Sequence, residues 1–220
     1  MHTHATRAAL ASVLAACAAS LAACNIVGPV AMLAAGPPTT PAQYTLDRER
    51  TAVVFIDDRA SVLPRRALRQ TIAQQVQNNL LGQNLVKTVI DAKSIAALAA
   101  RDPADKPSDI TSLGKAVSAD FVIYVSLDRF GISPDGQVFQ PYADARVKVL
   151  DVNKEQPRVW PEDREGHSVS LILPQRRGDM PKTASALAEA QETLARILGD
   201  NVAQLFYKHD AVVHPSRERD

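Results

Sequence analysis

Two adjacent carboxylates, Asp57 and Asp58, follow a short apolar run at residues 51–56. The run has the length and the β-branched composition of a strand that is buried on both faces. In α/β sheets, ligands gather beyond the carboxyl ends of the strands, and these two side chains occupy that position. The pair therefore predicts a small-ligand-binding or enzymatic site at the sheet edge. A polar turn between a strand and a helix explains the same two residues without any site.

Basic and aromatic residues indicate a second kind of site, a contact with another protein. Arg65, Arg66 and Arg69 follow the carboxylate pair and could form a basic face for an acidic partner, whereas a solvated helix start is the alternative. Trp160 lies beside a proline in a charged loop, and Trp and Arg are favoured at the energetic centres of interfaces. These four residues are the candidate partner-binding residues. A Trp160 that folds under its own loop is the alternative there.

Other patterns that could do chemistry lack a necessary part. The Gly-Lys pair at residues 114–115 has neither the following Ser or Thr nor the earlier glycine of a phosphate-binding loop. Ser168 follows a histidine, but its surroundings depart from Gly-x-Ser-x-Gly at the last position. His167, His209 and His214 have no Cys or acid at the usual spacing of metal ligands. We therefore predict no catalytic residue, no metal and no cofactor.

Composition and charge exclude several functional classes. The chain of 220 residues is 46% hydrophobic and 22% charged, which is ordinary globular usage and enough for one core. Its formal net charge is +1, so no overall field would recruit nucleic acid. We accordingly expect one folded domain and no nucleic-acid partner.

Cysteine occurs only at Cys17 and Cys24, within and after an alanine-rich apolar run at the start of the chain. A weakly positive start, an apolar stretch and small residues before a cleavage point are typical of an export signal. The residues Leu-Ala-Ala-Cys at 21–24 resemble the bacterial lipobox. This resemblance implies lipid attachment to the Cys24 sulfur and cleavage before it. Residues 14–17 match the same pattern, but cleavage at Cys17 would leave too short an apolar stretch for a good signal.

The chain then divides into a lipoprotein signal peptide at residues 1–23, a lipidated tether at 24–50, a domain at 51–209 and a charged flexible tail at 210–220. Two or more acyl chains hold a protein stably on a bilayer without spanning it. We expect the acylated Cys24 to anchor the chain to a membrane on the side that faces the periplasm. Asn25 after the lipidated cysteine favours the outer membrane over the inner one if the familiar Gram-negative sorting rules hold.

Hydrophobic periodicity predicts the elements that must position the candidate residues. An apolar residue at every fourth position predicts a helix that has Pro64 in its first turn and ends at Gly82. A short helix capped by Ser94 follows. A long helix with a weak point at Gly199 closes the domain.

The remaining predicted elements are strands at 51–56 and 85–90, a helix at 110–117, an antiparallel hairpin of strands at 120–127 and 142–152, a strand at 168–173 and the closing helix at 183–207. Strands and helices in this order predict an α/β sheet with helices packed on it.

The segment at residues 114–123, a helix end followed by Ala-Asp and an aromatic strand, resembles a recurrent segment of bacterial envelope proteins. With the closing helix, residues 51–208 are similar to the fold shared by the curli-secretion lipoprotein CsgG, the penicillin-binding-protein activator lipoprotein LpoB and the amino-terminal domain of TolB. The resemblance implies an α/β (α+β) domain, in which a mixed sheet with an antiparallel hairpin carries helices that include a long carboxyl-terminal one.

The same resemblance implies a function in the envelope. Our leading hypothesis is a membrane-anchored lipoprotein, not an enzyme, that binds another envelope protein as an assembly or regulatory module in the cell envelope or in secretion. One alternative is a homo-oligomeric, self-associating component of an export or transport apparatus. Charged residues on the hairpin at 120–152 argue against a membrane-crossing pore. The other alternative is a small-ligand-binding or enzymatic domain that uses Asp57 and Asp58.

Overall fold

The computed structural model describes residues 39–103, 107–175 and 180–210, which belong to two compact units. The larger unit is Ala42–Tyr207. The smaller unit joins Met1–Pro41 to Lys208–Asp220, and its described part is an antiparallel pair of two-residue strands, β1 (Thr39–Thr40) and β8 (His209–Asp210). Cys24, the predicted signal peptide and His214 lie outside the described residues.

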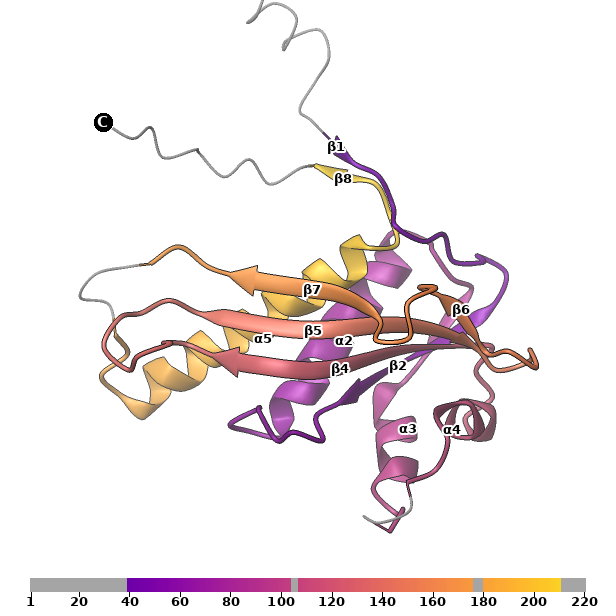
Figure 1. Cartoon of the computed structure of the whole chain (residues 1–220), viewed down its shortest axis with the longest axis horizontal. Coiled ribbons are helices and arrows are strands. Elements are labelled where there is room, and N and C mark those ends of the chain that lie inside the picture. Colours follow the sequence, from indigo (N-terminus) through magenta and orange to yellow (C-terminus); the bar gives the residue numbers. More distant parts are fainter. Residues whose placement is uncertain (1–38, 104–106, 176–179, 211–220) are drawn as a thin grey trace, which may run out of the picture. The chain divides into compact units, whose positions relative to one another are not determined.

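A six-stranded mixed sheet forms the centre of the larger unit (Figure 1). Its strands are β2 (Thr51–Asp57), β3 (Thr88–Ile90), β4 (Phe121–Gly131), β5 (Tyr142–Asp151), β6 (Arg158–Trp160) and β7 (His167–Ile172). β3 and β4 run parallel to β2 on its two sides. β5 pairs antiparallel with β4 and also with β6 and β7. The predicted mixed sheet with an antiparallel hairpin is therefore confirmed.

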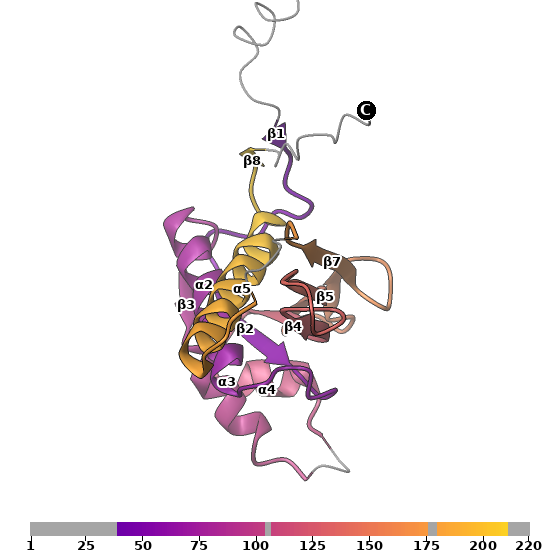
Figure 2. The same cartoon turned by 90° about the vertical axis from the view of Figure 1, so that its left-hand side faces the viewer.

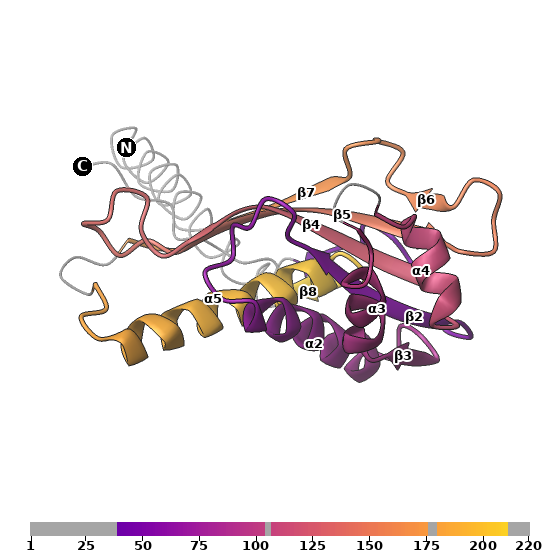
Figure 3. The ribbon, with the colours of Figure 1, turned by 90° about the horizontal axis from the view of Figure 1, so that it is seen from below.

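Two long helices, α2 (Ala67–Gly82) and α5 (Ala184–Gln204), lie side by side along one face of this sheet (Figure 3). The predicted four-residue repeat of α2 is confirmed, because its members are fully buried; they are Leu68, Ile72, Val76 and Leu80. The long carboxyl-terminal helix is confirmed as well. Figure 2 shows the same two helices from the side, next to the strands that they cover.

Two short helices, α3 (Ala92–Ala99) and α4 (Ile110–Ala116), cover the other face of β2 and β4. Successive residues of a strand point to opposite faces, so Val53 packs among α3 and α4 residues while its neighbour Val54 packs among those of α2 and α5. Both valines have no exposed surface. The β2 run is apolar throughout because both of its faces are covered there.

Several local predictions were wrong, and polar side chains explain two of them. α2 begins at Ala67 and Pro64 lies in the preceding loop, which the Asp58 carboxylate holds through hydrogen bonds from the backbone N–H groups of residues 62 and 63. Asp91, not Ser94, caps α3, since its carboxylate accepts a hydrogen bond from the Lys93 N–H.

Gly199 is a point of close contact between the two long helices rather than a weak point. A Cβ atom at this position would lie 2.7 Å from Cβ of Gln75 and 2.9 Å from the carbonyl oxygen of Ile72. Contacts this short do not occur between real Cβ atoms and their neighbours. The glycine therefore allows α5 to approach the backbone of α2.

The segment at residues 42–50, which the sequence placed in the tether, contacts the sheet and α5 in the larger unit. Leu46 is buried, and the backbone N–H groups of Gln43 and Tyr44 donate to the carbonyl oxygen of Leu205. Arg50 forms an ion pair with Asp151 at the end of β5. β6 was not predicted, and it adds a short strand to β5 in the segment that follows Asp151.

Candidate functional site

Asp57 is the last residue of β2 and is nearly buried, with 8% of its surface exposed. Its Oδ2 accepts a hydrogen bond of 2.6 Å from the hydroxyl of Tyr124 and forms an ion pair of 2.9 Å with Nε of Arg59. Burial, followed by the hydrogen bond to Asp57, raises the pKa of the Tyr124 phenol. The carboxylate therefore has a fixed position and a balanced charge.

Asp58 has a different role in the loop between β2 and α2. Its Oδ1 accepts a hydrogen bond of 2.7 Å from the Val62 N–H, and its Oδ2 lies 3.3 Å from the Arg69 guanidinium. The Arg69 guanidinium also donates to the carbonyl oxygen of Asp58. These contacts hold the turn that leads the chain into α2. Asp57 and Asp58 are adjacent in sequence but have separate contacts, so the two carboxylates do not form one site.

The three arginines that were predicted to form a basic face have different environments. Arg65 reaches α5, where it donates to the carbonyl oxygen of Ala188 at 3.0 Å and to the side chain of Gln191 at 3.1 Å. It also forms an ion pair with Glu192 on the same helix. Arg69 contacts Asp58, and Arg66 is exposed. Only Arg66 and Arg69 line a common cavity.

Trp160 lies in an aromatic cluster and is only partly exposed. Its ring centroid is 4.9 Å from that of His167, 5.9 Å from that of Tyr44 and 6.2 Å from that of Phe206. The cluster joins residue 160 to the segment before β2 and to the end of α5. The role of Trp160 as a partner contact stays a prediction. The structure does not place Trp160 next to any of the three arginines.

A cavity of about 440 Å³ lies where β2 ends, between α2 on one side and α3 and α4 on the other. Its β2 wall is formed by residues 54–57, and the α3 wall consists largely of alanines. Exposed side chains such as those of Arg66 and Lys93 line it as well, so the cavity opens to solvent. Its volume falls in the usual range for ligand sites, about 300–1,000 Å³.

The charged residues around this cavity are predominantly basic. Four cationic side chains line it, from Arg59, Arg66, Arg69 and Lys93, against the two carboxylates of Asp57 and Asp102. Among the described residues, neither Arg66 nor Lys93 has an ion pair or a side-chain hydrogen bond. The cavity can therefore accept a negatively charged group without first breaking a contact of these two side chains.

The sequence pointed to this cavity only through Asp57 and the arginines. Lys93 and Asp102 were not predicted as site residues, because a single lysine on a short helix and a single aspartate in a loop carry no local signal. The Asp102 carboxylate accepts hydrogen bonds from both the N–H and the hydroxyl of Ser108, and these bonds lower its pKa.

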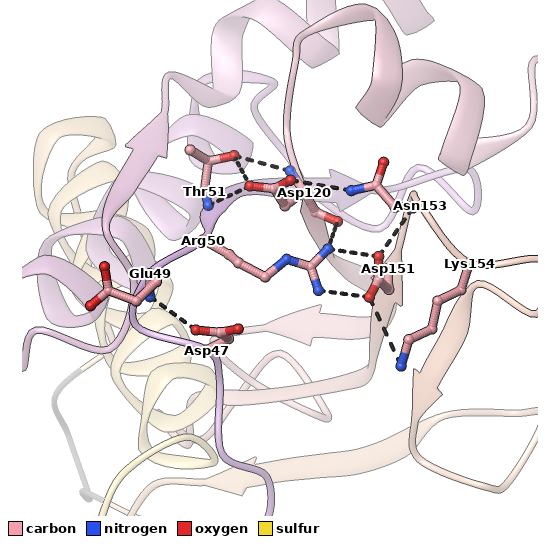
Figure 4. Close-up of polar contacts among 8 residues, drawn as sticks. All are labelled: Asp47, Glu49, Arg50, Thr51, Asp120, Asp151, Asn153 and Lys154. Carbon is pink, nitrogen blue, oxygen red and sulfur yellow. Dashed lines mark hydrogen bonds and ion pairs between the residues drawn. The ribbon is translucent and has the colours of Figure 1, made fainter.

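A second polar cluster lies at the opposite end of β2 (Figure 4). Arg50 binds Asp151 there, and Thr51 donates to the Asp120 carboxylate through both its N–H and its hydroxyl, each at 2.9 Å. The Asn153 side chain donates to the other Asp120 oxygen at 3.2 Å. Because these groups satisfy one another and Asp151 is buried, the cluster fixes the ends of three strands rather than offering a free ligand group.

The part of the chain that the structure describes contains neither a candidate metal cluster nor a candidate membrane-spanning helix. Within residues 39–103, 107–175 and 180–210, no group of three or more His, Cys, Asp or Glu side chains is placed to hold a metal ion. No helix in those ranges combines the length and the apolar character that crossing a bilayer requires.

No protein-family model matches this sequence, and no curated protein sequence is significantly similar to it. Among solved structures, the chain is similar to the PelC dodecamer from Paraburkholderia phytofirmans, with a TM-score of 0.44 and 11% identity over 78% of this chain and 98% of that chain. It is also similar to lipoprotein GNA1162 from Neisseria meningitidis, with a TM-score of 0.39 and 12% identity over 69% of this chain and 99% of that chain. TolB from Acinetobacter baumannii matches with a TM-score of 0.29 and 11% identity over 77% of this chain and 31% of that chain. Bacterial lipoproteins are thus among the similar structures, but these scores assign no function, and the resemblance to CsgG and LpoB stays a prediction.

Proposed function

We propose that this chain is a lipid-anchored lipoprotein of the bacterial envelope, whose α/β domain binds another envelope protein as an assembly or regulatory module. The observation that carries the proposal is the Leu-Ala-Ala-Cys sequence at 21–24, which ends an alanine-rich run with the character of an export signal. Acylation of Cys24 would hold the domain on a membrane that faces the periplasm. Asn25 favours the outer membrane.

The two carboxylates do not act as one pair. Asp57 contacts Tyr124 and Arg59 through Oδ2, and Asp58 holds a turn. The surface that the domain offers to a partner in this proposal is the cation-lined cavity beside Asp57.

The contacts of residues 42–50 limit how far the domain can lie from the lipid. If Cys24 carries the lipid, about 18 residues separate it from Ala42, where the larger compact unit begins. Fully extended, they would span at most about 65 Å. The partner in this proposal must therefore present its binding segment close to the membrane surface.

Mass spectrometry of the protein extracted from membranes tests the anchor. We expect a mature amino terminus at Cys24 that carries the lipid. Cys24→Ser should abolish the modification, and Cys17→Ser, the matched control, should retain it. An unmodified terminus at Cys24, or wild-type protein that fractionates with the cytosol, would overturn the anchored function.

Crosslinking in intact membranes tests the partner. We expect one reproducible envelope protein to be crosslinked to the wild-type chain and to be lost with Cys24→Ser. Crosslinks that form exclusively between copies of this chain would contradict the proposal and favour the self-associating alternative, which light scattering on the detergent-solubilised protein would then size.

A further inference from the structure

The β2 strand extends past the end of β3 at the edge that borders the cavity. β3 pairs only with the first three residues of β2, in the register Thr51 to Thr88, Ala52 to Val89 and Val53 to Ile90. β4 continues along the other side of β2 as far as Asp57. Among the described residues, no strand pairs with residues 54–57 on the β3 side, and these four residues line the cavity. Residues 54–57 therefore extend for about 13 Å past β3 along the cavity; Val54 is fully buried, while Phe55, Ile56 and Asp57 keep some exposed surface.

The walls on the two sides of this edge differ in character. The α3 wall presents small side chains, among them Ala92, Ala96 and Ala99, and leaves room beside the strand. The α2 wall presents Arg66, Arg69 and Gln70. An exposed strand edge next to a helix is the arrangement in which proteins add a peptide as an extra strand, with the backbone providing affinity and adjacent pockets providing specificity.

The uncompensated charges indicate which peptide this groove would take. Arg66 and Lys93 are exposed, and neither has an ionic or hydrogen-bonded side-chain partner in the described part of the chain. Arg69 also lines the groove, and its Nε is buried and has no acceptor among the described residues. A buried donor without a partner destabilises the protein, and an acceptor from a ligand would offset this cost. Two free cations and one unsatisfied donor together select an anionic ligand.

We propose that the groove between β2, α2 and α3 binds an extended acidic peptide segment of the partner, which adds a strand to residues 55–57 and places its carboxylates near Arg66 and Lys93. The proposal rests on the proposed function, because it assigns the surface through which a protein-binding module contacts its partner. The strand edge accounts for an extended peptide, and the charge of the rim accounts for its acidity.

Fluorescence anisotropy on the full chain in detergent provides the test. The probe is a fluorescein-labelled pool of hexapeptides with glutamate at alternate positions and Val or Thr between them. The matched pool carries glutamine in place of glutamate, and a third pool keeps the glutamates but carries N-methyl groups on alternate backbone nitrogens. We expect the acidic pool to bind at least about tenfold more tightly than either of the others. Equal binding of the acidic and glutamine pools, or of the acidic and N-methylated pools, would overturn the proposal.

Two groove variants and two control variants locate the binding. Ala96→Trp fills the groove and Arg66→Glu reverses its charge; each should weaken binding of the acidic pool about tenfold or more. Arg66→Glu should leave the fold intact, since α2 has no acidic residue in its first turn and a carboxylate there is favourable for the helix dipole. Ala97→Trp, on an exposed part of α3 outside the groove, and Lys87→Glu should leave binding unchanged. Unchanged binding by Ala96→Trp would overturn the assignment.

Two further measurements separate this proposal from related ones. Millimolar phosphate or free glutamate should weaken peptide binding only as an equal ionic strength of NaCl does; complete displacement would identify a small-anion site and overturn the peptide groove. In the membrane crosslinking experiment, Ala96→Trp should lose the partner that the wild-type chain captures. Retained capture by Ala96→Trp would refute the groove and leave the proposed function standing, whereas no capture by the wild-type chain would refute the proposed function itself.

Discussion

Arg50 and Asp151, which are 101 residues apart in the sequence, form a two-point ion pair with both guanidinium–carboxylate distances at 2.7 Å. The Asp151 side chain is 2% exposed and that of Arg50 is 25% exposed. The Arg50 guanidinium also lies 3.9 Å from the ring centroid of Phe121. This pair joins the segment that precedes β2 to the end of β5, so it holds together parts of the sheet that the chain connects only over a long distance.

Removal of Arg50 should destabilise the domain strongly. Arg50→Ala leaves the buried Asp151 carboxylate with only a 4.0 Å ion pair to the exposed Lys154, and loss of one partner of a buried pair costs about 3 kcal/mol or more. Arg129→Ala is the matched control: Arg129 pairs with Asp144 but has a side chain that is 61% exposed, so its loss should cost about 1 kcal/mol or less. Urea unfolding measures both values. Equal losses in the two variants would contradict a special role for Arg50.

The same cluster should make stability depend on acid pH. The hydrogen bond from Arg50 lowers the pKa of Asp151, and the two bonds from Thr51 lower the pKa of Asp120. A carboxyl group with a lower pKa in the folded state binds fewer protons there than in the unfolded chain. The stabilisation that such a carboxyl group contributes is therefore complete when the pH is well above its unfolded-state pKa of about 3.9. It is lost as the pH falls through the lowered pKa of the folded state.

Asp151→Asn tests this pH dependence. At neutral pH the variant should be less stable than the wild type, but its free energy of unfolding should fall less steeply below about pH 5, so that the two curves converge in acid. Glu189→Gln, which removes an exposed carboxylate outside the cluster, is the control. Parallel curves for the wild type and Asp151→Asn would show that Asp151 does not titrate as its contacts require.

The sequence was informative where a pattern is local. A repeat of four predicted α2 and the alternation in β4 and β5 predicted the hairpin, because burial on one face directly sets the period of apolar residues. Arg50 and Asp151 gave no such signal, since an ion pair across the fold depends on which strands become neighbours. The starts of α2 and α3 were displaced for a similar reason: Asp58 and Asp91 hold turns whose geometry depends on individual side chains.

The cavity, too, could be predicted only in part from the sequence. Asp57 was predicted from its place at the end of a strand, and it does line the cavity. The open edge of β2 arises because β3 stops after three residues, and the basic rim arises because α3 brings Lys93 opposite Arg66. Neither fact can be read from the types and spacing of the residues along the chain. The sequence indicated where to look but not which groups meet there.

Gly199 allows a clean test of the contact between α5 and α2. In an exposed helix, Gly→Ala should stabilise by about 1 kcal/mol. Gly199→Ala should instead destabilise by about 1–3 kcal/mol, because the new methyl group would overlap Cβ of Gln75 and the Ile72 carbonyl oxygen. Gly82→Ala at the end of α2 meets nothing within 4 Å and should be neutral or slightly stabilising. A stabilised Gly199→Ala would show that the helices separate at little cost.

Trp160 reports on the segment at residues 42–50, because it is the single tryptophan of the chain. Tyr44 in that segment lies with its ring 5.9 Å from the Trp160 ring, and both pack against the main core. Tyr44→Ala should open this side of Trp160 to water, shift its emission to longer wavelength and reduce stability by about 2 kcal/mol. Tyr142→Ala, at the far end of β5, should leave the emission unchanged. If the emission of Tyr44→Ala matched that of the wild type, Trp160 would not be covered by the segment, and the earlier hypothesis of a free tryptophan that contacts a partner would gain support.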